Sequence, residues 1–120
     1  MEKKELGTWG EDKAAFYLRK KGYTVIEKNF SCRFGEIDII AKKGGMVAFV
    51  EVKLRKNNDF AAAREFVTYS KQRRIISTAQ LWMMKNESEL QPRFDVIEIY
   101  APQGTSTRRP EITHIEDAFQ

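Results

Sequence analysis

Two acidic residues and a lysine, Asp38, Glu51 and Lys53, lie on either side of Gly44-Gly45. If the two glycines form a two-residue β-turn, the flanking strands pair so that Asp38 faces Glu51. Opposed Cβ atoms in such a pair are roughly 4.5–5.5 Å apart, and like charges at that distance destabilise a hairpin. A shared proton or a divalent cation would relieve the repulsion. Lys53 follows Glu51 by two residues, so its side chain leaves the same face.

These residue types suit metal-assisted hydrolysis of a phosphodiester bond. Mg²⁺ or Mn²⁺ prefers hard oxygen ligands, and two carboxylates, a backbone carbonyl expected from Val52 and a phosphate oxygen can supply them. A bound cation polarises the phosphate and lowers the pKa of a water ligand. Lys53 would orient that water or offset the developing negative charge. The alternative is a solvent-facing surface on which Asp38 and Glu51 each meet a different cation.

The same turn aligns apolar residues on the opposite face of the predicted hairpin. The expected pairs there are Ile37 with Val52, Ile39 with Val50, and Ala41 with Ala48. We expect this to be a core face, because a shift of one residue in one strand would pair each buried side chain with an outward-pointing one. The face that carries Asp38 and Glu51 also holds the pairs Glu36 with Lys53 and Ile40 with Phe49.

Hydrophobic periodicity predicts the elements that must hold this hairpin. They are a helix at 5–21, strands at 23–29, 35–41, 46–54 and 93–100, a second helix from between Ala61 and Ser70 to about Lys85, and an optional short edge strand within 111–120. This order predicts an α/β or α+β arrangement with one mixed sheet. Residues 1–120 are expected to form one domain, with a core at about 5–100 and a loop and tail at 101–120.

The bulk composition is that of an ordinary globular protein, with 42% apolar and 32% charged residues and a net charge of +4. No apolar run approaches the roughly 20 residues of a membrane span, and the N-terminal segment lacks the apolar stretch of a signal peptide. The single cysteine, Cys32, excludes an internal disulfide framework. These features favour a cytoplasmic location without membrane insertion.

Two basic clusters suggest contacts with phosphates. Lys53, Arg55 and Lys56 form one cluster, and Lys71, Arg73 and Arg74 form the other. Arg55 extends the face of Glu51 and Lys53 by two residues, so we expect it to contact a backbone phosphate. The alternative for both clusters is a solvated surface.

The remaining candidates are interpreted as structural. His114 is the only histidine and has no partner at zinc-ligand spacing, so it is predicted to lie at the surface. Cys32 is predicted to be half-buried rather than nucleophilic. Aromatic residues that suit base stacking are Trp9, Phe66, Tyr69 and Trp82, although helical spacing favours core packing for the two tryptophans. Asp95 is expected to hold a backbone amide or a basic side chain rather than to act in catalysis.

At these positions the sequence resembles the PD-(D/E)XK nuclease superfamily, whose motif is an acid, a variable gap and then acid–x–Lys. It is more closely similar to the YraN-like family of small bacterial proteins, which in turn are similar to archaeal Holliday-junction resolvases. The segments that carry the resemblance are Gly10-Glu11, Phe34-Gly35-Glu36-Ile37-Asp38, Phe49-Val50-Glu51-Val52-Lys53 and Arg93-Phe94-Asp95, within residues 5–100. Ile37 stands where the superfamily motif has proline, but the acid itself is retained.

The resemblance implies a restriction-endonuclease-like α/β core, with a central mixed sheet flanked by helices, a Mg²⁺ or Mn²⁺ site and nucleic acid as substrate. DNA is favoured over RNA, and the sequence leaves the choice between them open. It also implies that Glu11 reaches the site from the first helix as a catalytic and metal-binding residue. Gly7, Ala14 and Leu18 share that helix face, and the two small residues would let it approach the sheet closely. Lys71 and Gln72 match a phosphate-contacting position in related nucleases, with a solvated helix face as the alternative.

The expected function is therefore a metal-dependent nuclease, with selectivity for branched or nicked DNA as one option. One alternative is a nucleic-acid-binding module that keeps the fold without catalysis. Another is a protein–protein adaptor in which the carboxylate pair is a relic. A homodimer is suggested only by the two-fold symmetry of the junctions that related resolvases cut.

Overall fold

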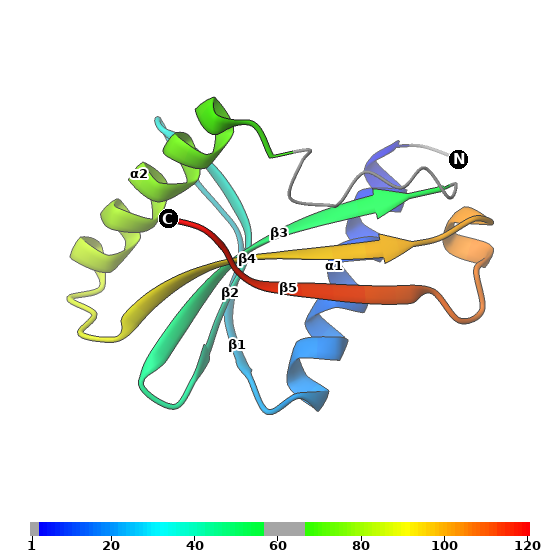
Figure 1. The fold of residues 1–120 in the computed structure, drawn as a ribbon, viewed down its shortest axis with the longest axis horizontal. Coiled ribbons are helices and arrows are strands. Elements are labelled where there is room, and N and C mark those ends of the chain that lie inside the picture. Colours follow the sequence, from blue (N-terminus) through cyan, green and yellow to red (C-terminus); the bar gives the residue numbers. More distant parts are fainter. Residues whose placement is uncertain (1–2, 57–66) are drawn as a thin grey trace.

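A five-stranded sheet lies between two helices in the computed structural model, which describes residues 3–56 and 67–120 (Figure 1). The elements are α1 (Lys3–Lys20), β1 (Thr24–Cys32), β2 (Gly35–Lys43), β3 (Met46–Arg55), α2 (Tyr69–Lys85), β4 (Gln91–Tyr100), a short 3₁₀ turn η2 (Gly104–Ser106) and β5 (Glu111–Phe119). The sheet order is β1-β2-β3-β4-β5, with β3 and β4 parallel and the other neighbours antiparallel. The predicted α/β class with one mixed sheet is confirmed.

Local signals in the sequence account for the ends of the elements. Gly22, at φ +93°, follows α1 and adopts a backbone conformation that favours glycine. Gly44, at φ +61°, forms the turn between β2 and β3 together with Gly45. Thr68 caps α2, because its side-chain oxygen accepts a hydrogen bond from the backbone N–H of Lys71 at 3.2 Å.

The predicted register of the central hairpin is confirmed near the turn. Ile39 pairs with Val50, Ala41 with Ala48, and the paired stretch ends at Lys43 and Met46 beside the two glycines. Before Ile39, β2 follows β1 instead, and Ile37 pairs with Phe30. The strands therefore part near the acidic residues, which opens space beside them.

Each face of the sheet carries its own hydrophobic core. Helix α1 covers the face that includes Ile39, Ala41, Ala48 and Val50, and α2 covers the face that includes Ile40, Val47 and Phe49. The prediction of one core face is therefore incomplete, because helices cover both faces of the sheet. The pairing of Ile37 with Val52 is wrong: Ile37 packs in the core under α2, and Val52 packs against the core under α1.

Helix α1 approaches the sheet closely at a different glycine from the one that was predicted. A Cβ atom added at Gly10 would lie 2.7 Å from Cδ1 of Leu54, whereas one at Gly7 would meet no atom within 4 Å. The close approach is therefore at Gly10, and the prediction for Gly7 is wrong. Ala14 and Leu18 are fully buried, as predicted.

Trp82 is buried in the core under α2 and Trp9 packs against the core under α1, so core packing of both tryptophans is confirmed. Cys32 is half-buried, also as predicted. Phe66 lies outside the described residues. Within those residues, neither helix has the length and apolar character needed to cross a bilayer.

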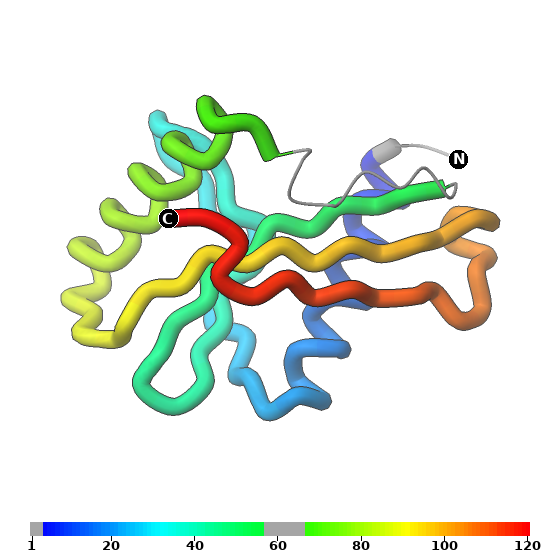
Figure 2. Tube along the Cα trace, viewed as in Figure 1, coloured from blue at the N-terminus to red at the C-terminus, as the bar shows by residue number. Residues whose placement is uncertain are grey.

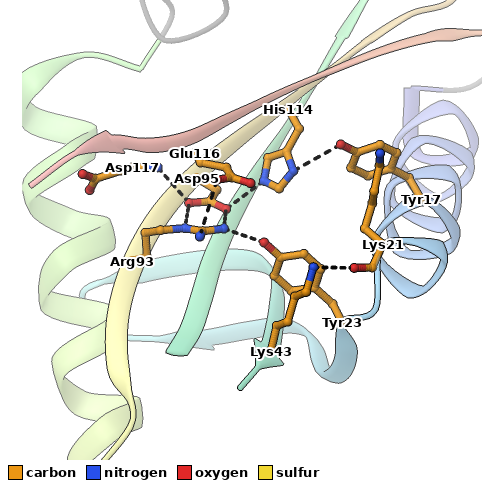
Figure 3. A network of polar contacts seen from close by, with 9 residues as sticks. All are labelled: Tyr17, Lys21, Tyr23, Lys43, Arg93, Asp95, His114, Glu116 and Asp117. Atoms are coloured by element: carbon orange, nitrogen blue, oxygen red, sulfur yellow. Dashed lines mark hydrogen bonds and ion pairs between the residues drawn. The ribbon is translucent and has the colours of Figure 1, made fainter. Parts of the chain in front are cut away.

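A polar network joins α1, β4 and β5 on the face of the sheet that α1 covers (Figure 3). Its centre is Asp95, which is fully buried and accepts hydrogen bonds from Arg93 at 2.7 and 2.8 Å. The Asp95 carboxylate also accepts from Nε2 of His114 at 2.7 Å and from the backbone N–H of Asp117 at 3.1 Å. The expectation that Asp95 holds a backbone amide and a basic side chain is confirmed.

His114 is not at the surface, which corrects the prediction. Its side chain is 6% exposed, and its ring also lies against Tyr17, with the two polar atoms 3.4 Å apart. The hydroxyl of Tyr23 accepts a hydrogen bond from Arg93 at 2.6 Å. Burial alone would raise the pKa of Asp95, but the hydrogen bonds from His114 and Arg93 outweigh it and hold the pKa below its ordinary value.

Candidate active site

A cleft of about 560 Å³ opens where β2 and β3 part and α2 begins. It is lined by Gly35, Glu36, Asp38, Glu51, Thr68, Ser70, Lys71, Arg74 and Ile75. Asp38 and Glu51 thus face the same cleft from adjacent strands, but their predicted cross-strand pairing lies beyond the paired stretch of β2 and β3, which ends at Ile39 and Val50. Lys71 and Arg74 face it from α2, so acidic and basic side chains meet across the opening.

The environment of Asp38 opposes its negative charge. Burial, followed by the charge of Glu51, raises the pKa of Asp38 to about 7, and the charges of Glu11 and Glu36 act in the same direction. The backbone N–H of Val52 donates to Oδ2 of Asp38 at 2.8 Å and opposes the shift. Near neutral pH, and without a cation in the cleft, a proton on Asp38 relieves much of the repulsion between the two acids.

Two lysines offset the charge of Glu51, whose side chain is only 8% exposed. Nζ of Lys71 lies 2.7 Å from Oε1 of Glu51, and Nζ of Lys53 lies 3.5 Å from the same oxygen. Burial lowers the pKa of Lys71, but the hydrogen bond and charge of Glu51 more than compensate and raise it overall. Burial, together with Lys71, lowers the pKa of Lys53.

Glu11 is half-buried on α1, and its charge contributes to the raised pKa of Asp38. Within residues 3–56 and 67–120, however, no three histidine, cysteine or acidic side chains gather closely enough to hold a metal ion. The carboxylates that converge are those of Asp38 and Glu51. The assignment of Glu11 as a catalytic and metal-binding residue therefore stays a prediction.

The residues predicted to contact nucleic acid occupy different environments. Lys71 lines the cleft, and Arg73, two residues further along α2, is exposed and lines an adjoining hollow. The side chain of Arg55 is 10% exposed and lies 3.5 Å from Glu98. The amide nitrogen of Gln72 donates to the carbonyl of Val67 at 2.9 Å. Arg55 and Gln72 thus have protein partners, and their contacts with phosphate stay predictions.

Thr68 and Ser70 line the cleft but were not singled out from the sequence. Thr68 carries a recognisable signal, because threonine is favoured at a helix N-cap and this one marks the start of α2. The helix start brings both residues to the cleft, together with Lys71. Their position there depends on the docking of α2 against β2 and β3, which no local pattern describes.

Comparison with known proteins identifies a family for this chain. The model of "Uncharacterised protein family UPF0102" matches residues 10–99. A UPF0102 protein of Caldanaerobacter subterraneus is 43% identical over 120 residues, covering 99% of this chain and 98% of the relative. One from Clostridium perfringens is 45% identical over 118 residues, covering 98% and 95%. One from Caldicellulosiruptor saccharolyticus is 43% identical over 120 residues, covering 99% and 100%.

Proposed function

We propose that this chain, which belongs to the uncharacterised protein family UPF0102, is a metal-dependent endonuclease of the PD-(D/E)XK type that hydrolyses phosphodiester bonds in nucleic acid, with DNA as the favoured substrate. One observation carries the proposal: Asp38 and Glu51 face the same cleft, where Lys53 and Lys71 surround Glu51. This combination of two acids and a lysine suits cleavage of a phosphate ester.

The chemistry of the donors fits a hard divalent cation. Asp38 and Glu51 offer carboxylate oxygens, Val52 offers its peptide carbonyl, and Glu11 is the candidate for a further carboxylate. A proton on Asp38 and the ammonium group of Lys71 offset the acidic charges in the absence of a cation, and both can be displaced by one. Mg²⁺ or Mn²⁺, when bound, would polarise the phosphate and acidify a water molecule.

The protein residues have separate tasks in this proposal. Lys53 lies beside Glu51 and offsets the negative charge that develops on the phosphate. Lys71 and Arg74 face the cleft from α2 and hold the substrate backbone. The N-terminus of α2 adds positive potential at the same edge of the cleft. Glu51 and Asp38 would hold the divalent cation, which supplies the positive charge that binds the reacting phosphate.

Cleavage assays on single-stranded, duplex and branched DNA test the proposal. We expect cleavage with Mg²⁺ or Mn²⁺, lowered at least about a hundredfold in Asp38→Asn and Glu51→Gln, because each variant keeps the shape of the side chain and removes its charge. Glu111→Gln is the matched control, since Glu111 is an exposed acid on β5, two strands away from Glu51. A wild-type protein that leaves all three substrates intact, or a Glu51→Gln variant with full activity, would refute the proposal.

A second function is favoured by the ion pair between Lys71 and Glu51, which already neutralises one of the two acids in the cleft. In that case the domain binds nucleic acid without cleaving it, and Lys71 is the permanent counter-ion of Glu51. Binding would then survive Glu51→Gln and weaken in Arg73→Ala, with no cleavage by the wild-type protein. Assays of binding and cleavage on the same oligonucleotides separate the two functions.

A further inference from the structure

A second hollow, of about 430 Å³, adjoins the cleft of Asp38 and Glu51. Its lining consists of Phe34, Tyr69, Ser70, Arg73, Arg74 and Ser77. Ser70 and Arg74 line both spaces, so a ligand that extends out of the cleft enters the hollow directly. The turn between β1 and β2 lies beside the first turns of α2 and forms one wall (Figure 2).

The hollow presents two aromatic side chains to solvent. Phe34 is 39% exposed and Tyr69 is 75% exposed, and they are among the few large hydrophobic side chains at the surface of the described residues. They come from separate parts of the chain, the β1–β2 turn and the first residue of α2. The guanidinium group of Arg33 lies 4.8 Å from the centre of the Phe34 ring. A flat ligand can stack here between rings and arginines.

The charges around the hollow favour an anion. The first residues of α2 include Lys71, Arg73 and Arg74 and no acid, although the positive end of a helix dipole favours acidic side chains. Of these, Lys71 has Glu51 as a partner, and Arg73 is exposed at the hollow. A phosphate at this edge would satisfy both the helix terminus and the arginines.

We propose that the hollow binds an unpaired nucleotide beside the reacting phosphate, with its base stacked on Phe34 and Tyr69 and its phosphate held by Arg73 and Arg74. This rests on the proposed nuclease function and narrows its substrate to nucleic acid with a single-stranded segment at the cleavage point. Bases inside a duplex are already stacked on one another and have no free face for a side chain. Stacking also accepts any base, so no sequence preference is expected at this position.

Binding without catalysis tests the hollow directly. In EDTA, we expect Phe34→Ala and Tyr69→Ala each to weaken binding of single-stranded oligothymidylate about fivefold to a hundredfold, and to leave binding of a blunt duplex unchanged. Phe16→Ala is the matched control, because Phe16 is 60% exposed, carries Lys20 over its ring and lies on α1, under the other face of the sheet. Arg73→Ala should weaken binding of both forms.

A base analogue reports the stacking itself. 2-Aminopurine within the oligothymidylate should lose fluorescence when the wild-type protein binds. It should keep most of its fluorescence when the oligonucleotide is saturated with the Tyr69→Ala variant. Equal losses of single-strand and duplex binding in Phe34→Ala and Tyr69→Ala, or an unchanged fluorescence signal, would overturn the proposal. Unchanged melting temperatures of the variants would exclude a folding defect.

Cleavage assays keep this inference separate from the nuclease proposal. Suppose that Glu51→Gln abolishes cleavage while Phe34→Ala and Tyr69→Ala keep the wild-type ratio of single-strand to duplex binding. The nuclease function is then supported, and the nucleotide site in the hollow is refuted. Suppose instead that the wild-type protein cleaves no substrate while the two aromatic variants lose single-strand binding. The hollow is then supported as a nucleotide-binding site, and the nuclease function is refuted. Preferential cutting beside unpaired nucleotides, lost in Tyr69→Ala, supports both.

Discussion

The raised pKa of Asp38 makes the stability of the protein depend on pH. Its pKa is raised from 3.8 to about 7 in the folded state, because it is buried next to Glu51. The folded state therefore binds the proton more tightly than the unfolded state does. Without metal, this group makes stability fall as the pH rises from about 4 to about 7, after which its contribution is constant.

Asp38→Asn should therefore stabilise the metal-free protein above pH 7. The asparagine keeps an oxygen that can accept from the Val52 N–H and removes the charge that Glu51 repels. We expect a gain of about 1–3 kcal/mol in the free energy of unfolding at pH 8, and a much smaller gain at pH 4. Urea unfolding in EDTA at the two pH values measures it. An Asn variant that is less stable than wild type at pH 8 would contradict this account of the site.

A divalent cation bound between Asp38 and Glu51 should turn their mutual repulsion into a contribution that stabilises the folded state. A ligand that binds only the folded state stabilises it by about 2.7 kcal/mol when present at a hundred times its dissociation constant. We expect Mn²⁺ to raise the melting temperature of the wild-type protein, and Glu51→Gln to abolish the rise. Glu111→Gln should respond like the wild type. An adaptor protein with a relic carboxylate pair would show no rise, so this measurement also decides that alternative.

At the scale of elements, Asp95 connects β4 to its neighbours. It accepts hydrogen bonds from Arg93 on the same strand, from His114 on β5 and from the backbone of Asp117, where the pairing of β4 with β5 is irregular. Tyr17 of α1 contacts the other ring nitrogen of His114 (Figure 3). One buried carboxylate thus connects β4 with the last strand directly and with the first helix through His114.

Asp95→Ala should destabilise the fold by about 3–5 kcal/mol, because it leaves Arg93 and His114 without their buried acceptor. Urea unfolding at pH 7 measures the loss. Glu116→Gln is the control, since Glu116 is 59% exposed and lies 3.7 Å from the same arginine; its effect should stay within about 0.5 kcal/mol. A loss for Asp95→Ala as small as the control's would show that the network does not pin β5.

The pH dependence of this network has the opposite sign to that of Asp38. The pKa of Asp95 lies below its ordinary value of 3.8, so its stabilising contribution is complete above that pH and is lost as the pH falls further. Asp38 and Asp95 thus differ in how folding affects their charge. Folding favours the charged form of Asp95 and opposes the charged form of Asp38.

For the whole molecule, the net charge of +4 matters less than its placement. Lys71, Arg73 and Arg74 project from the beginning of α2, at the cleft and the adjoining hollow, while α1 lies across the sheet. This end of the molecule is where a polyanion would bind. The two helices leave both sheet faces buried, so the ends of elements are the surface available for a site.

The salt dependence of DNA affinity tests whether the basic residues at the start of α2 contact phosphates. We expect the affinity for DNA to fall with salt, and Arg73→Ala to reduce the slope of log affinity against log salt by about 1. Arg19→Ala should leave the slope unchanged, because Arg19 is an exposed arginine at the far end of α1. Affinity titrations across salt concentrations provide the slopes. Equal slopes for Arg73→Ala and the wild type would place the binding surface elsewhere.

Local sequence determined the parts of this protein that involve neighbours in one hairpin or one helix. The two glycines and the alternation around them set the register of β2 and β3 from the turn to Ile39 and Val50, and Asp38 and Glu51 lie just beyond that paired stretch, where both line the cleft. Helix and strand positions followed from periodicity, since apolar spacing reports which side chains share a face. The α/β class with one mixed sheet followed from the order of these elements, whereas the strand order came from the structure.

Only the tertiary structure decided contacts between elements. The partner of His114 is 19 residues away on another strand, so nothing near His114 in the sequence indicates that it is buried. Ile37 and Val52 separate because β2 stays paired with β1 after its pairing with β3 has ended. Lys71 reaches Glu51, and Phe34 and Tyr69 line the same hollow, only through the docking of α2. Spacing specifies which face a side chain occupies, whereas the packing of whole elements specifies what it meets there.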